Sequence, residues 1–260
     1  MNRLADQPWC APAARLISAI AVPTAEGRLY DVDMRLRPSG EAGPIASHFA
    51  GFARYQRESA WTWEHMALTR ARPVAGEAAL RGQVSDTLEA VLRAPRDPRR
   101  LVIDVADMRR RIADENLRPL PWDLKNRRGG LIDLEFIVQY LMLREAASSR
   151  QILRRDTAQA LLGLGEAGLL SRQGQRELGD AAALLRDVQA VLALLGGGLP
   201  ATAALPEPDA ATLARCVGAV DFAHLDADIT TATARVRSWY VRLIEEPARR
   251  AAGEIGDSTQ

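Results

Sequence analysis

One segment alternates strictly between apolar and charged residues, and its isolation constrains the fold more than any other feature of the sequence. The segment is residues 28–37, and within it residues 30–37 alternate four apolar residues with two aspartates and two arginines. This period of two is typical of a β-strand with one buried face, and residues 38–40 follow it with a turn signal. A single strand cannot form a sheet. Either its partner strands are not evident in the sequence, or the rest of the sheet is absent from this chain.

The remainder of the chain is expected to be helical. Alanine, leucine and arginine dominate it, and all three are good helix formers. A short helix is expected over residues 12–22, and Asp156 and Ser171 are candidate N-caps. Prolines and glycines separate further candidate helices at 47–72, 77–93, 98–116, 131–147, 156–168, 171–195, 209–219 and 226–250. The predicted fold class is therefore mainly α, with the remnant of an α/β sheet followed by a helical bundle.

The charged face of the predicted strand carries two carboxylates and two guanidinium groups. Asp31, Asp33, Arg35 and Arg37 would emerge on one side, about 7 Å between neighbours. Carboxylates on a rigid strand suit Mg²⁺, which prefers oxygen ligands and often bridges to phosphates. The arginines could neutralise a triphosphate or the charge on a transferring phosphorus. An exposed strand face with its charges paired along and across it explains the same pattern, and spacing does not decide between the two.

A second segment combines two glycines with basic residues before an apolar helix. Gly129 and Gly130 precede the helix expected from residue 131. Backbone N–H groups at a glycine-rich helix start can approach an anion, and the helix N-terminus favours negative charge. Lys125, Arg127 and Arg128 would add to this preference. The pattern makes Lys125, Gly129 and Gly130 candidate phosphate-binding residues.

The same helix carries two carboxylates, Asp133 and Glu135, in its first turns. Residues two apart lie on roughly opposite faces of a helix, so these do not form a carboxylate pair. Both could simply interact with the helix dipole. Because the helix is apolar nearly all round, however, at least one carboxylate is expected to meet buried surface and to need a partner. This favours a functional role, and both are candidates for the nucleotide site.

Two of the five tryptophans, Trp61 and Trp63, lie in one helical segment. They are expected to pack in the core. Glu64 and His65 have no third ligand at a useful spacing, so a metal site is not indicated. His65 is expected to be a hydrogen-bonded structural residue.

Charge and cysteine usage exclude several classes of protein. A net charge of +1 provides no overall field for nucleic acid or an anionic membrane, and no apolar run approaches the length of a membrane span. Cys10 and Cys216 are far apart and lack neighbouring ligands, so neither a zinc site nor a disulfide framework is indicated. The expected location is a reducing cytoplasm.

Together, three segments resemble the glutamine synthetase adenylyltransferase family. Residues 29–40 resemble the strand that bears the family's third metal-binding aspartate, and residues 61–72 match the segment that follows it. Residues 123–136 resemble the entry to the helical domain shared with PII uridylyltransferases. The resemblance spans about residues 12–250. The Trp-Thr-Trp-Glu-His sequence of residues 61–65 is closer to the second of the two nucleotidyltransferase units of the bifunctional enzymes, the one implied to attach AMP.

The resemblance implies a chemistry and its participants. The family transfers AMP from ATP to a tyrosine of glutamine synthetase, and its partner half reverses this under control of PII protein. Two Mg²⁺ ions would clamp the attacking and leaving oxygens, with Asp33 as a metal ligand and Asp31 in support. Arg35, Arg37 and the residues of the second segment would contact the nucleotide.

The resemblance also implies the domain organisation. Residues 1–90 would be an incomplete nucleotidyltransferase domain, residues 91–250 a helical bundle of the PII-uridylyltransferase type, and residues 251–260 a disordered tail. The family's Gly-rich turn and Asp-x-Asp pair lie well upstream of the third aspartate, and the residues before Asp33 do not form them. The Asp31-Val32-Asp33 triplet could imitate the pair, but no Gly-Ser turn leads into it. We therefore expect an N-terminally truncated chain with little activity alone.

Two other readings remain open. The chain could be a non-catalytic helical module that binds glutamine synthetase or PII. A PII uridylyltransferase fragment is a third reading, disfavoured by the Trp-Thr-Trp-Glu-His wording of residues 61–65.

Overall fold

The computed structural model describes residues 9–25, 27, 32–115, 120–196 and 205–257. The chain divides into two compact units. The first comprises Met1–Leu68 and Arg72–Val91, and the second comprises Thr69–Ala71 and Leu92–Gln260. The sequence-based boundary after residue 90 lies within one residue of the main division.

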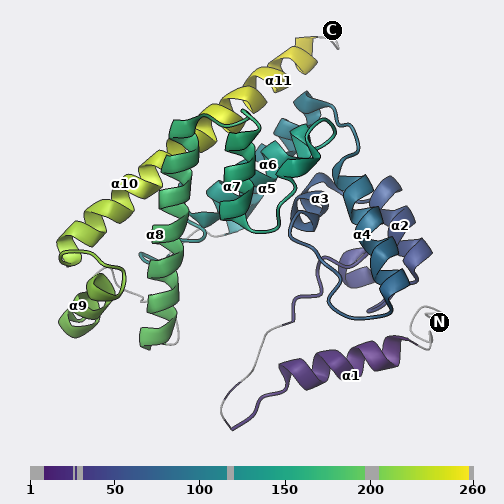
Figure 1. Cartoon of the computed structure of the whole chain (residues 1–260), viewed down its shortest axis with the longest axis horizontal. Coiled ribbons are helices and arrows are strands. Elements are labelled where there is room, and N and C mark those ends of the chain that lie inside the picture. The colour runs from purple at the N-terminus through teal and green to yellow at the C-terminus, as the bar shows by residue number, and fades with distance from the viewer. Residues whose placement is uncertain (1–8, 26, 28–31, 116–119, 197–204, 258–260) are drawn as a thin grey trace. The chain divides into compact units, whose positions relative to one another are not determined.

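The first unit is built from short helices (Figure 1). They are α1 Cys10–Ala21, a 3-10 turn at Gly40–Ala42, α2 Phe49–Glu58, α3 Thr62–Leu68 and most of α4 Ala78–Leu92. The single helix expected over residues 47–72 is interrupted between α2 and α3. Glu64 explains the restart of the helix, because its carboxylate accepts the Trp61 backbone N–H at 2.8 Å and the Tyr55 hydroxyl at 2.9 Å. The first of these contacts satisfies a backbone donor that the helix start leaves free.

The strand predicted over residues 28–37 is not formed in its described part. Residues 32–34 have no regular structure and residues 35–39 form turns and a bend, while residues 28–31 lie outside the described residues. Local bonds replace the ladder: the Arg35 backbone N–H donates to the Asp33 carboxylate at 2.9 Å. A strand needs a neighbour to pair its backbone groups, and the pairing recorded in the described residues is one isolated bridge between Thr24 and Gly27. The mainly α class is confirmed, but the sheet remnant is not found there.

The Trp-rich segment differs in part from its prediction. Trp61 was expected in the core, yet 67% of its surface is exposed, because it lies at the break between α2 and α3. Trp63 is half-buried. His65 is a hydrogen-bonded structural residue as expected, with Nε2 2.9 Å from the Gln56 carbonyl oxygen.

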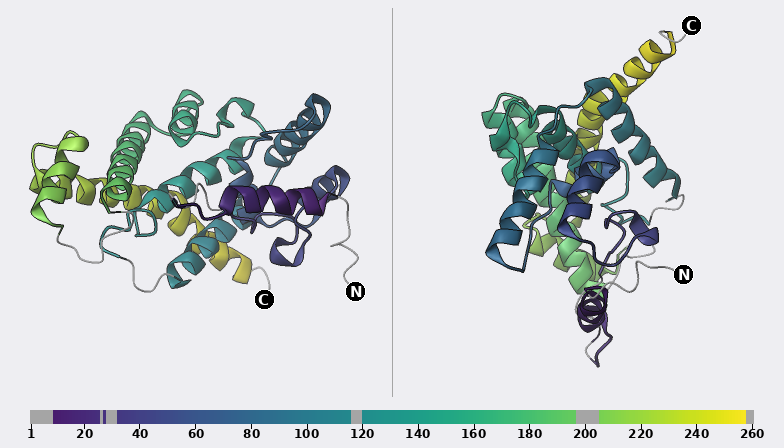
Figure 2. Two further views of the ribbon diagram at one scale, coloured as in Figure 1. Left: turned by 90° about the horizontal axis from the view of Figure 1, so that it is seen from below. Right: turned by 90° about the vertical axis from the view of Figure 1, so that its right-hand side faces the viewer.

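The second unit is a helical bundle, as predicted (Figures 1 and 2). Helix α6 lies at its centre, packing against α5, α7, α8 and α10. Ten of its side chains are buried, which explains its apolar character all round. The helices are α5 Pro98–Glu115, α6 Leu131–Glu145, α7 Thr157–Glu166, α8 Arg172–Gly196, α9 Glu207–Cys216, α10 Phe222–Tyr240 and α11 Glu246–Asp257, with a 3-10 turn at Arg150–Ile152.

The loop before α6 is anchored in the core of this unit. Trp122 and Leu124 are buried in one cluster with side chains of α8, α9 and α10. The Trp122 ring lies 5.7 Å from that of Phe222 at the start of α10. The loop is therefore held by packing at its beginning and by α6 at its end.

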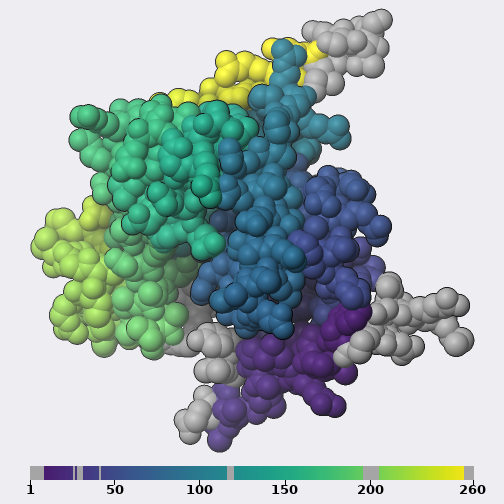
Figure 3. Space-filling model, turned by 45° about the vertical axis from the view of Figure 1, so that its right-hand side comes forward, coloured from purple at the N-terminus to yellow at the C-terminus, as the bar shows by residue number. Residues whose placement is uncertain are grey.

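In the space-filling view the side chains of α7 and α8 form one continuous surface (Figure 3).

Helices α10 and α11 form one continuous rod through a π-helical segment, Val241–Glu245 (Figure 1). The Glu246 N–H donates to the Val241 carbonyl, five residues back. Pro247 follows directly and has no N–H to continue the α-helical ladder, which accounts for the irregular bonding at this point. The tail predicted as disordered from residue 251 is instead helical to Asp257, and Ala251 is buried.

The predicted N-caps are confirmed. Asp156 accepts the Gln159 N–H at 2.9 Å, and Ser171 Oγ accepts the Gly174 N–H at 3.1 Å. Among the helices that the structure describes, none combines the length and the apolar character needed to cross a membrane.

Candidate functional site

The predicted metal-binding aspartate, Asp33, lies in an exposed loop of the first unit. The Arg35 guanidinium binds its carboxylate through Nε and Nη2, with Nη2 2.7 Å from Oδ2. This side-chain hydrogen bond and the Arg35 backbone N–H lower the pKa of Asp33 to about 2. Asp31, its predicted supporting carboxylate, lies outside the described residues. The carboxylate is thus ionised and already engaged by a cation of its own loop.

Arg37 holds the same loop in shape. Its Nη1 donates to the Met34 carbonyl at 2.8 Å and its Nε donates to the Gly43 carbonyl at 3.3 Å. Arg35 and Arg37 therefore serve local contacts in this structure, and their predicted role toward a nucleotide stays a prediction.

The described part of this loop does not fit a magnesium ion. Mg²⁺ requires several oxygen ligands at near-octahedral positions, and the described residues of the loop present one carboxylate, Asp33, bound by a guanidinium. No cluster of three or more histidine, cysteine, aspartate or glutamate side chains occurs among the residues described.

The most completely formed polar site lies in the second unit, at the start of α6. Asp133 is fully buried and ion-paired with the equally buried Arg109 of α5. Its other oxygen, Oδ2, accepts the Gly129 N–H at 2.6 Å. The backbone donor predicted to bind a phosphate is therefore occupied by a carboxylate of the same chain. The expectation that a carboxylate of this helix is buried with a partner is confirmed.

Arg109 also holds the backbone of the loop. Its Nη2 donates to the Asn126 carbonyl at 2.8 Å and to the Arg127 carbonyl at 3.3 Å. Asp123 closes the other side of the turn, because its carboxylate accepts the Asn126 N–H at 2.9 Å and the side-chain amide at 2.7 Å. The loop is wrapped around one buried guanidinium.

Two buried polar atoms in this unit have no hydrogen-bond partner among the described residues, Arg109 Nη1 and the Tyr240 hydroxyl. Burial raises the pKa of Tyr240 far above its usual value, and the negative charge of Asp133 raises it further. Tyr240 is therefore neutral, with a hydroxyl that can donate or accept.

The two glycines are required by close packing. Gly129 has φ +76°, and a Cβ there would lie 2.0 Å from the Thr233 carbonyl oxygen of α10. At Gly130 a Cβ would lie 2.4 Å from the Leu124 carbonyl oxygen. Packing thus explains both glycines without a ligand, and their predicted phosphate role stays a prediction.

The remaining predicted residues lie on the surface of this region. Glu135 pairs with Arg70 at 2.8 Å and does not join Asp133, as the helical spacing predicts. Lys125 is exposed. The structure therefore brings Gly129 and Asp133 into contact and leaves Lys125 and Glu135 outside the buried cluster.

Sequence reasoning missed Arg109, the residue that organises the loop. A signal was present: Arg109 continues the apolar stripe of Leu101 and Val105 at intervals of four residues, and all three are buried. A charged residue on an apolar helix face requires a buried partner. The partner could not be identified without the fold, because it lies 24 positions away on another helix.

Comparison with known proteins gives two family matches in order along the chain. Residues 5–87 match the model described as glutamate-ammonia ligase adenylyltransferase. Residues 103–244, more than half of the chain, match the model described as GlnD PII-uridylyltransferase. The two matches fall on either side of the division between the compact units.

Bacterial relatives cover nearly the whole chain. A protein of Xanthobacter autotrophicus is 44% identical over 90% of it, and one of Bradyrhizobium sp. (strain BTAi1) is 44% identical over 89%. A third, from Rhodopseudomonas palustris (strain BisB5), is 42% identical over 88%. All three are named bifunctional glutamine synthetase adenylyltransferase/adenylyl-removing enzyme. The chain spans 24% of the length of the first two and 23% of the third.

Proposed function

We propose that this chain, which belongs to the glutamine synthetase adenylyltransferase family, takes part in the transfer of AMP from ATP to a tyrosine of glutamine synthetase in the cytoplasm. A GlnD PII-uridylyltransferase domain covers more than half of its length. Regulation of nitrogen assimilation would follow from that modification. PII protein is the proposed signalling partner.

The observation that carries this proposal is the extent and order of the similarity. Identity of 44% continues through both compact units of the chain, so it is not confined to a widespread helical domain. The relatives are named for both attachment and removal of the adenylyl group. The attachment direction rests on the wording of residues 61–65.

We propose that the chain alone transfers little AMP. Asp33, the predicted metal ligand, is engaged by Arg35 at 2.7 Å. Gly129, a predicted phosphate contact, is engaged by Asp133. Both contacts would have to open for a nucleotide with magnesium to use these groups.

The test is transfer of labelled AMP from ATP with magnesium to purified glutamine synthetase by the full chain. We expect little or no label above background. Rapid transfer by the unaltered chain would contradict the proposed low activity. Rapid transfer that survives Asp33→Ala would refute the assignment of Asp33 as a metal ligand, and the matched variant Asp86→Ala controls for loss of an acidic side chain elsewhere in the same unit.

A second candidate function is favoured by the surface of the bundle. Leu194 at the end of α8 and Val220 just before α10 are each 86% exposed. Leu192, Leu213 and Leu225 share one buried cluster, which places the end of α8, α9 and the start of α10 at the same end of the unit. Contiguous exposed apolar side chains mark protein-binding sites, and we propose this end of the unit as one. This end suits a non-catalytic module that binds glutamine synthetase or PII.

Binding measurements separate the two candidates. The full chain is titrated with glutamine synthetase and, separately, with PII protein, and the double variant Leu194→Ser/Val220→Ser is compared with the control Leu162→Ser. Leu162 of α7 is also exposed, at 44%. Binding that the double variant loses and the control retains supports the module. Absence of binding to either protein refutes it.

A further inference from the structure

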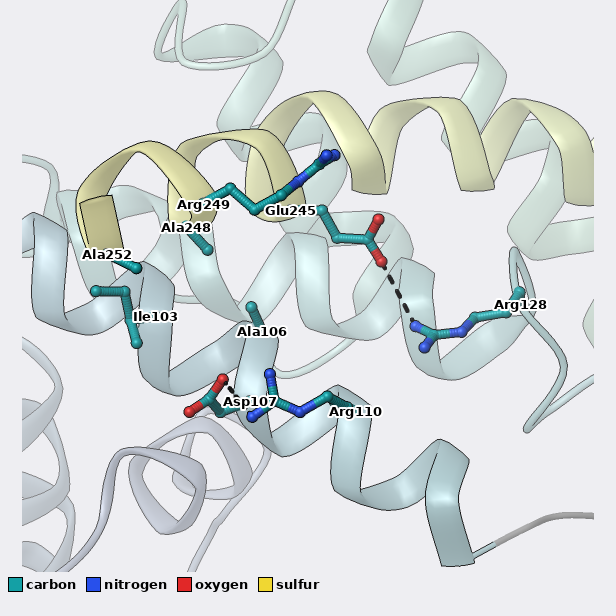
Figure 4. A pocket seen from close by; sticks show the side chains of 9 residues that line it. All are labelled: Ile103, Ala106, Asp107, Arg110, Arg128, Glu245, Ala248, Arg249 and Ala252. Carbon is teal, nitrogen blue, oxygen red and sulfur yellow. Dashed lines mark ion pairs between the residues drawn. The ribbon is translucent and has the colours of Figure 1, made fainter. Parts of the chain in front are cut away.

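A groove in the second unit lies between α5 and α11, beside the π-helical segment (Figure 4). Its volume is about 330 Å³, within the range of small-molecule sites. Its floor contains Ala106, Ala248 and Ala252, whose short side chains leave the helix surfaces accessible. Three arginines line it, namely Arg110, Arg128 and Arg249.

The two carboxylates of the groove are already neutralised. Glu245 receives both Nη1 and Nη2 of Arg237, each at 2.7 Å, and Arg237 is not among the lining residues. These hydrogen bonds, chiefly, lower the pKa of Glu245. Asp107 pairs with Arg110 at 3.0 Å. Neither carboxylate therefore depends on Arg128 or Arg249 for its counter-charge.

Arg128 and Arg249 are thus the two cations of the groove that are not the main counter-ions of its carboxylates. Arg128 Nη1 lies 3.6 Å from Glu245 Oε1, beyond hydrogen-bond distance, and the side chain is 44% exposed. Arg249 follows Glu245 by one helical turn and makes no hydrogen bond or close ion pair among the described residues, although its charge contributes to lowering the pKa of Glu245. Both could turn to an incoming anion without breaking a strong contact, since Glu245 would keep Arg237.

We propose that this groove binds a diphosphate group, with Arg128 and Arg249 as its principal ligands. Guanidinium groups bind phosphate oxygens in pairs of charge-assisted hydrogen bonds. Two guanidinium groups can each bind one phosphate of a diphosphate, whereas a single carboxylate would engage only one of the two guanidinium groups. A volume of about 330 Å³ also leaves room beyond the diphosphate for an attached organic group. Arg128 belongs to the loop that contains Gly129, but the groove includes neither the Gly129 N–H nor Asp33, so this site goes beyond the proposed transfer function.

The test is calorimetric titration of the full chain in magnesium-free buffer with inorganic pyrophosphate and, in parallel, with ADP. We expect saturable binding that weakens as salt is added. Arg128→Gln and Arg249→Gln should each weaken it about tenfold or more, the effect of losing charge-assisted hydrogen bonds. Tighter binding of ADP would show that the attached group also contacts the groove, and equal binding that the diphosphate alone is recognised; both support the site.

Matched variants locate the binding. Arg176→Gln removes an exposed arginine of α8 outside the groove, and Lys125→Gln removes an exposed cation of the loop that carries Arg128 but does not line the groove; neither should change the affinity. Absence of saturable binding by the unaltered chain overturns the proposal. So does adenosine binding as tightly as ADP, or a loss in Lys125→Gln or Arg176→Gln equal to that in the groove variants. None of these readouts depends on AMP transfer.

Discussion

Asp133 carries a charge with no access to water, and its partners are all within the chain. Removing one member of a buried ion pair leaves the other charge uncompensated, at a cost of about 3–5 kcal/mol. Asp133→Asn keeps the shape of the side chain but leaves Arg109 without a counter-ion. We expect the free energy of unfolding of the second unit to fall by that amount, measured by urea denaturation followed by circular dichroism.

Glu135→Gln is the control for this prediction, since Glu135 belongs to the same helix but pairs with Arg70, which is 53% exposed. Exposed pairs contribute at most about 1 kcal/mol. The double apolar variant Arg109→Met/Asp133→Leu should also remain destabilised, because the Gly129 N–H and the Asn126 carbonyl would lose their partners. Equal losses for Asp133→Asn and Glu135→Gln would contradict the structural role of the buried pair.

The exposed pair of Asp33 and Arg35 makes a prediction about pH instead. Arg35 lowers the pKa of Asp33 from 3.8 to about 2. A lowered pKa means that the contribution to stability is present above the unfolded value of 3.8 and is lost as the pH falls through about 2. Because Asp33 is exposed, solvent screening keeps this contribution small.

Carbon-detected nuclear magnetic resonance of the carboxyl groups can measure the titration of Asp33 directly. Arg35→Gln should raise the pKa of Asp33 toward 3.8, because it removes the largest cause of the shift. Arg57→Gln, a change on the exposed side of α2, should leave it where it is. If neither substitution changes the pKa of Asp33, the contact between Arg35 and Asp33 does not persist in solution.

At the scale of an element, the approach of α10 to the loop before α6 depends on one glycine. Gly129→Ala would combine a positive φ of +76° with a Cβ 2.0 Å from the Thr233 carbonyl oxygen. We expect a loss of more than about 2 kcal/mol, from backbone strain together with displacement of the helix. Urea denaturation measures it.

Gly168→Ala is a matched control, because Gly168 has φ +70° but open space around the added Cβ. Strain alone should cost it about 1 kcal/mol. If the two alanine variants lose the same stability, the contact with α10 is not what requires Gly129.

Prediction from sequence succeeded where local patterns decide the outcome. The caps at Asp156 and Ser171 depend on side chains and backbone groups three residues apart, so their pattern is visible in the sequence. The strand predicted at 28–37 is not formed over its described residues, 32–37, because alternation describes a side-chain pattern, whereas a strand also needs a neighbour for its backbone. The continuous helix expected over 226–250 is confirmed, but the π-helical segment Val241–Glu245 within it was not predicted, although Pro247 removes a backbone donor there.

The candidate site shows the same division. Burial of an acidic side chain in α6 follows from the apolar residues around it, and the structure confirms it for Asp133. The identity of its partner, Arg109, required the fold. The Gly-Gly pair predicts an anion site, and the Gly129 N–H does bind an anion. That anion is the carboxylate of Asp133 in the same chain.

At the scale of the whole molecule, the two units differ in the amount of core that holds them. Among the described residues, the buried apolar side chains of the first unit are Cys10, Ala53, Met66, Leu88 and Val91, whereas α6 alone buries more than these. The first unit also exposes large apolar side chains, including Trp61 at 67% and Val74 at 75%. A smaller core gives less protection against opening, because hydrophobic burial is the main favourable contribution to folding.

Hydrogen exchange should therefore separate the two units. Amides of α6 are expected to exchange only when the second unit unfolds, and amides of α2 and α3 to exchange much earlier through opening of the first unit. Asp133→Asn sharpens the test, because it should lower the protection of α6 by the same free energy that urea denaturation reports while leaving α2 and α3 unchanged. Mass spectrometry of peptic peptides resolves these segments. If the substitution lowers protection equally in both units, they unfold as one cooperative structure, and the division of the chain into two separately stabilised units is wrong.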